Sequence, residues 1–120
     1  MTIPTDAVVF AEVMDPADLM EYEANMTDLL DNASAITSFT IALLPDAILA
    51  GVQIKSGAAY DPGLVLVNKA IDFWLEVQVA DRENVAYTAG IRVGVVITIN
   101  TNHVPARRRQ RTFVVNVRQR

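Results

Sequence analysis

The sequence predicts an all-β protein folded as a single antiparallel β-sandwich, and three observations support this fold class. Short runs of β-branched and aromatic residues recur along the chain, separated by turn signals about every 8 to 12 residues. The strongest runs, residues 91–99 and 110–118, flank a turn-like stretch at 100–105 and predict a closing β-hairpin. The composition, 52% hydrophobic and 20% charged over 120 residues, is that of one folded domain.

The first residues predict a short arm or edge strand ahead of the main domain. Residues 8–13 are an apolar run, and Asp15-Pro16 interrupts the pattern after it. We therefore expect residues 1–14 to form the arm or edge strand and residues 15–120 to form the sandwich. A first strand packed on its own sandwich is the simpler interpretation, and an arm exchanged with a neighbouring subunit is the alternative. For the exchanged arm, the candidate interface residues are Val8, Val9 and Phe10.

Residues 18–30 fit two different patterns. As a helix, with Asp15 as its cap and Pro16 at its first position, the segment would place on one face Leu19, Tyr22, Met26 and Leu29. As a strand with one solvated face, it would alternate acidic or amide residues with Met20, Tyr22, Ala24 and Met26. Periodicity alone slightly favours the helix.

Alternation of β-forming residues predicts four further strands before the hairpin. These strands are expected at residues 36–43, 52–55, 64–67 and 70–77, and a polar loop tip is expected at residues 81–84. The last of the four strands carries the only tryptophan of the chain, for which core packing is the expected role. The predicted core residues on these strands and the hairpin are Phe39, Ile41, Trp74, Val93, Val95 and Val115.

The residue types that catalysis and metal binding require do not occur in a usable arrangement. The chain has no cysteine, which excludes disulfides, thiolate zinc sites and cysteine nucleophiles. Its single histidine, His103, lies in a turn-like stretch, and we expect it to be a solvated loop residue. Glu21 and Glu23 would share one face of a strand and weakly repel each other rather than form a catalytic pair. We therefore predict a protein that is not an enzyme and uses no cofactor, metal ion or small-molecule substrate.

The charges are divided along the chain, although the net charge is only −4. Residues 1–31 hold eight acids and no Lys or Arg, whereas residues 106–120 hold six arginines and no acid. These charges either form two solvated surfaces or form complementary patches, and complementary patches favour head-to-tail association in a fixed orientation. The candidate interface residues are Arg107, Arg108, Arg109 and Arg111 on the basic side and Asp15, Asp18 and Glu21 on the acidic side.

Nucleic acid and membranes are not expected as partners. The chain is acidic, with a pI near 4.8, and the basic cluster at residues 107–111 is followed by only one aromatic residue, Phe113. No run reaches the about 18 uninterrupted apolar residues that a membrane helix needs. The first residues also lack the basic and apolar regions of a signal peptide, so we expect a soluble protein that is not secreted by that route.

A series of motifs runs from Asp15 to Arg118. Residues 15–22 read Asp-Pro-x-x-hydrophobic-x-x-Tyr, and further motifs follow at residues 26–30, 36–41, 73–75, 91–101 and 108–118. In their content and order these motifs resemble those of a family of small bacteriophage proteins, the fibre–tail adaptors. The chain departs from the family in a longer polar stretch at 77–88 and in the turn at 103–106. The residues before Asp15 lie outside the resemblance.

The resemblance implies an immunoglobulin-like sandwich that serves as a structural protein of a tailed bacteriophage virion. Such an adaptor forms part of a ring at the tail or neck and anchors tail fibres or other tail parts, after synthesis in the cytoplasm of the host bacterium. Its expected partners are copies of itself and other tail, neck or fibre proteins. The resemblance also implies that residues 19–26 are a strand. The alternatives are a head-decoration or neck-collar protein and a non-viral β-sandwich binding module.

Overall fold

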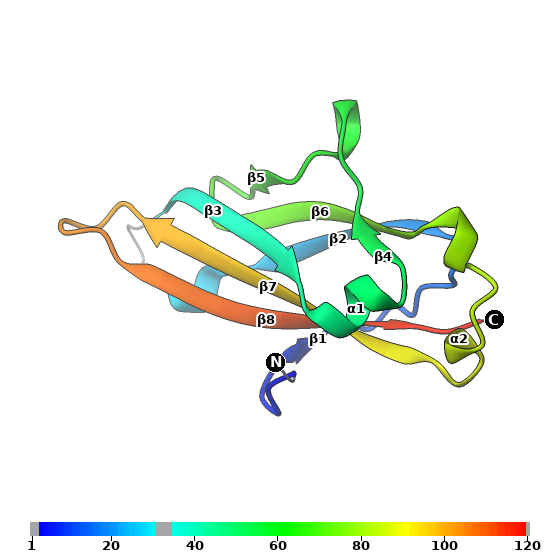
Figure 1. Ribbon diagram of the computed structural model, residues 1–120. Coiled ribbons are helices and arrows are strands. Elements are labelled where there is room, and N and C mark those ends of the chain that lie inside the picture. Colours follow the sequence, from blue (N-terminus) through cyan, green and yellow to red (C-terminus); the bar gives the residue numbers. More distant parts are fainter. Residues whose placement is uncertain (1–2, 31–34, 120) are drawn as a thin grey trace.

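Two packed β-sheets form the molecule in the computed structural model, which describes residues 3–30 and 35–119 (Figure 1). Sheet A has the strand order β1 (Val8–Val9), β8 (Arg108–Val117), β7 (Ile91–Thr101) and β3 (Ile36–Leu43). Sheet B has the order β2 (Leu19–Asn25), β6 (Ala70–Val77) and β4 (Val52–Ile54), and β5 (Gly63–Val65) also pairs with β6. The predicted all-β sandwich is therefore confirmed.

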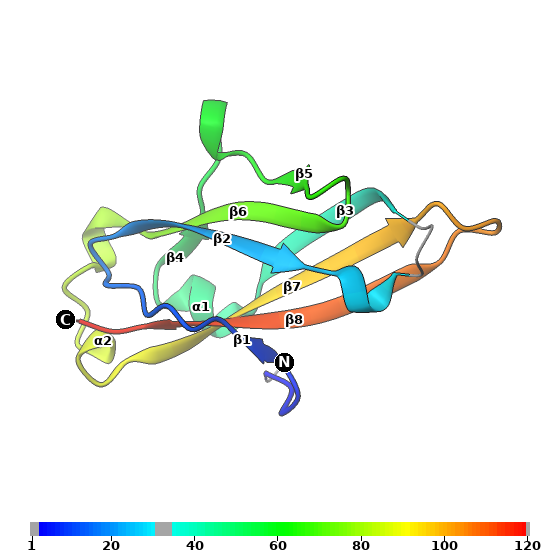
Figure 2. The same ribbon diagram turned by 180° about the vertical axis from the view of Figure 1, so that it is seen from behind.

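Two short α-helices and three 3-10 turns complete the described fold. Helix α1 (Pro45–Leu49) begins at the proline that ends β3, and helix α2 (Ala86–Ala89) precedes β7. The 3-10 turns cover Thr27–Leu29, Ala58–Tyr60 and Val79–Asp81. Figure 2 shows the sandwich from behind, with β2 beside β6 in the same sheet.

The closing hairpin predicted from the sequence is the longest pairing of the fold. Strands β7 and β8 pair antiparallel from Ile91 opposite Val117 to Asn100 opposite Arg108. The pleat of these strands sends alternate side chains to the core, where Val93, Val95 and Val115 are fully buried as predicted. Phe39 and Ile41, on the neighbouring edge strand β3, are only partly buried against the same core.

Residues 19–30 form a strand followed by a single 3-10 turn, so the slight preference for a helix was wrong. Tyr22, Ala24 and Met26 are buried and alternate with exposed polar residues, because β2 covers the core with one face. The strand predicted at residues 64–67 is also shorter, since Leu66 and Val67 adopt positive φ angles of 53° and 56° and begin the turn into β6.

Trp74 is not a core residue, and the prediction that placed it there was wrong by one position. Successive side chains of β6 point to opposite faces of sheet B, and its inward residues are Ile71, Phe73, Leu75 and Val77. Trp74 lies between Phe73 and Leu75 and is therefore on the solvent side, where it remains half-buried. Phe73 has no exposed surface and supplies the aromatic packing expected of the tryptophan.

The N-terminal residues pack on their own sandwich. Strand β1 pairs in parallel with β8, and Met14 continues along the same edge by an isolated bridge to Val117. The ring of Phe10 lies 5.0 Å from that of Tyr22 and 5.5 Å from that of Phe113, between centroids. Residues 8–14 are therefore an edge segment of sheet A in this structure.

We expect Phe73→Ala to lower the free energy of unfolding by about 3–5 kcal/mol, because it leaves a cavity in the centre of the core. Trp74→Ala removes a larger side chain, but from a half-buried site. It should therefore lower the free energy of unfolding by less than Phe73→Ala does. Urea unfolding of both variants measures the difference. A larger cost for Trp74→Ala would contradict this assignment of the two faces of β6.

The hydroxyl of Tyr22 is buried without a hydrogen-bond partner in the described part of the chain. Burial, with smaller contributions from the charges of Glu12 and Asp18, raises the pKa of Tyr22 to about 12. Because an unpaired buried hydroxyl is unfavourable, Tyr22→Phe should leave the free energy of unfolding unchanged or raise it by up to about 1 kcal/mol. Thermal unfolding at neutral pH tests this, and a loss of about 1 kcal/mol or more would show that the hydroxyl is stabilising.

Candidate interaction surfaces

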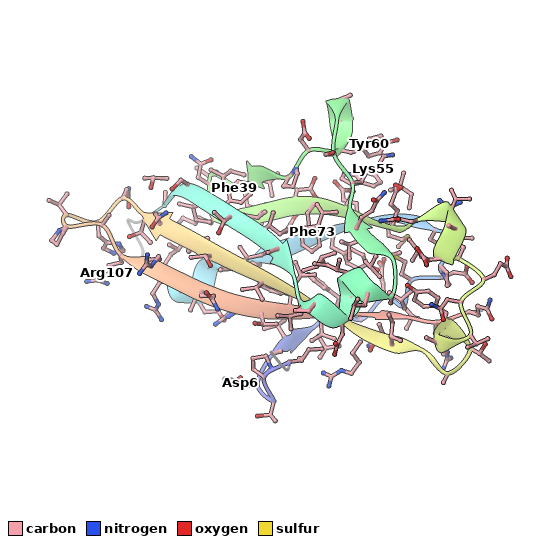
Figure 3. All side chains as sticks on the ribbon, viewed as in Figure 1. Asp6, Phe39, Lys55, Tyr60, Phe73 and Arg107 are labelled. Atoms are coloured by element: carbon pink, nitrogen blue, oxygen red, sulfur yellow. The ribbon has the colours of Figure 1, made fainter. Side chains whose placement is uncertain are left out.

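The basic end of the chain is a hairpin that extends from one end of the sandwich, where Figure 3 labels Arg107. The turn is fixed by paired contacts: the Thr101 amide donates to the Arg107 carbonyl at 2.9 Å, and the Asn102 amide donates to the Ala35 carbonyl at 3.0 Å. Arg108 and Arg109 follow this turn at the start of β8 and are exposed. Successive strand residues face opposite sides, so these two arginines give both sides of the hairpin a positive charge.

Arg111 differs from Arg108 and Arg109 because it forms an ion pair with an acid of the described chain. Its guanidinium nitrogen lies 3.1 Å from a carboxylate oxygen of Asp28, in the 3-10 turn after β2. This hydrogen bond, a backbone hydrogen bond and the charge of Arg111 hold the pKa of Asp28 below its ordinary value. By contrast, neither Arg108 nor Arg109 forms an ion pair with a described residue.

Asp15 and Asp18, two of the predicted acidic interface residues, organise the turn that leads into β2. The Asp15 carboxylate accepts a hydrogen bond from the Ala17 amide at 2.8 Å, and the Asp18 carboxylate accepts one from the Asp15 amide at 3.0 Å. This turn precedes Leu19, which pairs with Glu76 near the end of β6, whereas the basic hairpin lies beyond the other end of that strand. Asp15 and Asp18 are therefore far from the arginine hairpin of their own chain.

The outer face of sheet B, which points away from sheet A, carries an aromatic pair. Trp74 on β6 meets Tyr60, from the loop between β4 and β5, with ring centroids 5.1 Å apart and an interplanar angle of 89°. The Lys55 ammonium lies 5.8 Å from the centroid of the Tyr60 ring and 3.3 Å from a Glu76 carboxylate oxygen. Figure 3 shows Tyr60 and Lys55 at the projecting loop, away from the core residue Phe73 and from Arg107.

Three carboxylates lie beside Trp74 on this outer face. Glu23 is directly opposite Asp72 in the β2–β6 pairing, and Glu21 is directly opposite Trp74. Partial burial, a hydrogen bond with the Glu21 carboxyl and the charges of Glu21 and Glu23 together raise the pKa of Asp72 to about 6. Like charges placed opposite one another destabilise a sheet, so this acidic group is unfavourable as it stands. Glu21 is the predicted interface acid that belongs to this surface.

Aliphatic side chains are exposed at the end of the sandwich opposite the hairpin. Leu49 of α1 and Val85 next to α2 are each 83% exposed, and Ile48 and Val79 are also largely exposed. Exposed aliphatic groups gathered at one end are typical of a contact surface.

Two of the three predicted N-terminal interface residues are exposed: the exposed fraction is 41% for Val8 and 48% for Val9. Phe10 differs, because its ring packs against the core rings of Tyr22 and Phe113.

The described residues contain no group of three or more His, Asp or Glu side chains arranged to hold a metal ion. His103 lies at the turn of the basic hairpin, with its Nδ1 2.6 Å from the Thr101 hydroxyl. None of the helices in residues 3–30 and 35–119 is long and apolar enough to cross a membrane.

Comparison with protein-family models gives no match for this chain, and comparison with curated proteins gives no significant match either.

Sequence reasoning named the arginines and Glu21 as candidate interface residues, which stays a prediction, and it did not name the surface around Trp74. The three consecutive residues Phe73, Trp74 and Leu75 are all apolar. Alternation therefore does not show which of them faces outward. The outward position is marked instead by Asp72 and Glu76, which lie two residues on either side of Trp74. Tyr60 gave no such signal, because its contact with Trp74 depends on the course of a loop.

We expect stability to fall as the pH rises from about 4 to about 7, in part because of Asp72. Its pKa is higher in the folded state than in the unfolded state, so the folded chain binds the extra proton and loses that stabilisation on ionisation. Asp72→Asn should therefore stabilise the protein more at pH 7.5 than at pH 4. Solvent screening at this surface reduces the difference to about 1 kcal/mol.

Thermal unfolding of the Asp72→Asn variant at the two pH values measures this effect. Asp6→Asn, at an exposed carboxylate before β1, is the matched control and should show no such pH-dependent gain. An equal change for Asp72→Asn at both pH values would contradict the interpretation.

Proposed function

We propose that this chain is a structural component of a tailed bacteriophage virion, an adaptor in a ring at the tail or neck that anchors fibres or other tail parts. One observation carries the proposal: a single sandwich presents exposed charges of opposite sign on different surfaces. Arg108 and Arg109 project on the hairpin of sheet A, whereas Glu21 and Glu23 lie on the outer face of sheet B.

Two different complementary surfaces on one subunit favour heterologous contact between copies. Each copy then uses its hairpin to contact one neighbour and its acidic surface to receive another, so the contact repeats until it closes a ring or extends as a filament. Charge complementarity fixes the orientation of such a contact, and repetition around a ring multiplies modest individual affinities. The exposed aliphatic end, with Leu49 and Val85, leaves a further surface for a different tail protein.

The strand order supports the immunoglobulin-like part of the proposal. In an immunoglobulin sandwich, strands B, E and D share one sheet and strands C, F and G share the other. Here β2, β6 and β4 with β5 make one sheet, and β3, β7 and β8 lie next to each other in the other. The resemblance of residues 15–22 and of the later motifs to fibre–tail adaptors agrees with this order.

We expect the double variant Arg108→Glu, Arg109→Glu to be excluded from virions while the isolated chain stays folded. Both side chains are exposed, so the reversal of charge acts on contacts with neighbours rather than on the core. The measurement is the copy number of this chain in purified particles by quantitative mass spectrometry, with circular dichroism as the test of folding. Arg92→Glu with Arg118→Glu is the matched control, because both arginines are exposed and lie outside the hairpin turn. Incorporation of the Arg108→Glu, Arg109→Glu chain at the normal copy number would refute the proposed contact.

A further inference from the structure

We propose that the outer face of sheet B binds the arginine hairpin of a second copy of this chain, with Trp74 and Tyr60 as the platform for a guanidinium group and Glu21 and Glu23 as its anionic partners. This inference rests on the proposed role as a self-assembling virion component, and it names the surface that receives the hairpin. It also assigns a role to the only tryptophan, which the core does not use.

The aromatic pair is suited to a cation. A tryptophan face binds a guanidinium group well, because arginine is planar and stacks on aromatic rings. Trp74 and Tyr60 meet at right angles, 5.1 Å between centroids, and so present two ring surfaces in different orientations. One cation of the chain already uses this surface, since the Lys55 ammonium lies 5.8 Å from the Tyr60 ring centroid.

Within the described residues, the acidic side chains of Glu21, Glu23 and Asp72 beside Trp74 have no cation paired with them. Lys55 is paired with Glu76, and no described residue forms an ion pair with Glu21, Glu23 or Asp72. Partial burial, the hydrogen bond with Glu21 and the repulsion from Glu21 and Glu23 together raise the pKa of Asp72, so it holds its proton to a higher pH than an ordinary aspartate. A guanidinium bound there would offset this repulsion and would form charge-assisted hydrogen bonds with the carboxylates.

The hairpin of a second copy is the occupant that fits this face. Arg108 and Arg109 are exposed on an extended two-stranded element, which places positive charge on both of its sides. Within one molecule the hairpin belongs to sheet A, and the outer face of sheet B points away from sheet A (Figure 1). The contact therefore requires two molecules. A nucleic acid is disfavoured at this face, because Glu21, Glu23 and Asp72 repel phosphate groups.

The test uses the purified full-length chain and charge reversal on each surface. We expect the parent chain to self-associate over a concentration series from about 1 μM to about 1 mM in sedimentation velocity. The hairpin variant Arg108→Glu, Arg109→Glu and the face variant Glu21→Lys, Glu23→Lys should each raise the dissociation constant at least about tenfold. The four-substitution variant that combines them should regain association, because its acidic hairpin and its basic face again carry opposite charges.

Controls separate this contact from a general effect of charge. The control variant Asp46→Lys, Glu83→Lys changes the net charge as much as the face variant does. Both of its acids are exposed and lie outside the outer face of sheet B, so it should leave association unchanged. Trp74→Ala in the parent chain should weaken association about tenfold, and Trp74→Phe should restore part of the loss. Circular dichroism shows that each variant is folded before it is compared.

Two results would overturn the inference. One is a parent chain that stays monomeric over the whole concentration series. The other is a four-substitution variant that associates no better than either double variant, which would show that the two surfaces do not meet. Neither result depends on virions, so failure here is distinguishable from failure of the proposed virion role, which the copy number in particles tests.

Discussion

Strand β6 is the element on which the rest of the molecule depends. It is the central strand of sheet B, with β2 on one side and both β4 and β5 on the other. Its alternation sends Phe73 and Leu75 into the core and places Trp74 on the outer face. The same strand therefore holds the two sheets together and presents the candidate docking surface to solvent. A shift of register by one residue would exchange these two roles.

The position of charges relative to this strand supports the proposed contact between copies rather than a contact within one copy. The charges of Asp28 and Arg111 compensate each other in an ion pair within one chain, near the base of the hairpin. Glu21 and Glu23 lie on the outer face of sheet B, which points away from sheet A and from the hairpin that carries Arg108 and Arg109 of the same chain. The described chain thus pairs Asp28 with Arg111, whereas Glu21, Glu23, Arg108 and Arg109 form no ion pair with a described residue and are the charges on which the proposed contact depends.

Much of the fold could be predicted from the sequence, because strand periodicity and turn residues are local properties. The hairpin of β7 and β8, the strand β3 and the end of β3 at Pro45 all follow from them. The choice between helix and strand at residues 19–30 could not be made locally, since burial of Tyr22 and Ala24 against the facing sheet decides it. The candidate site was also out of reach, because the contacts of Trp74 with Tyr60 and of Glu21 with Asp72 join separate segments of the chain.

Because Trp74 is the only tryptophan, its fluorescence reports directly on the outer face of sheet B. Quenching of this emission by acrylamide, measured in dilute and in concentrated solutions of the parent chain, tests the central claim most directly. The account predicts that the quenching constant falls at least about twofold from the monomer to the associated chain, because a neighbouring hairpin covers the part of the ring that the monomer exposes. Associated protein whose Trp74 is quenched as readily as in the monomer would contradict it, because the copies would then meet through another surface.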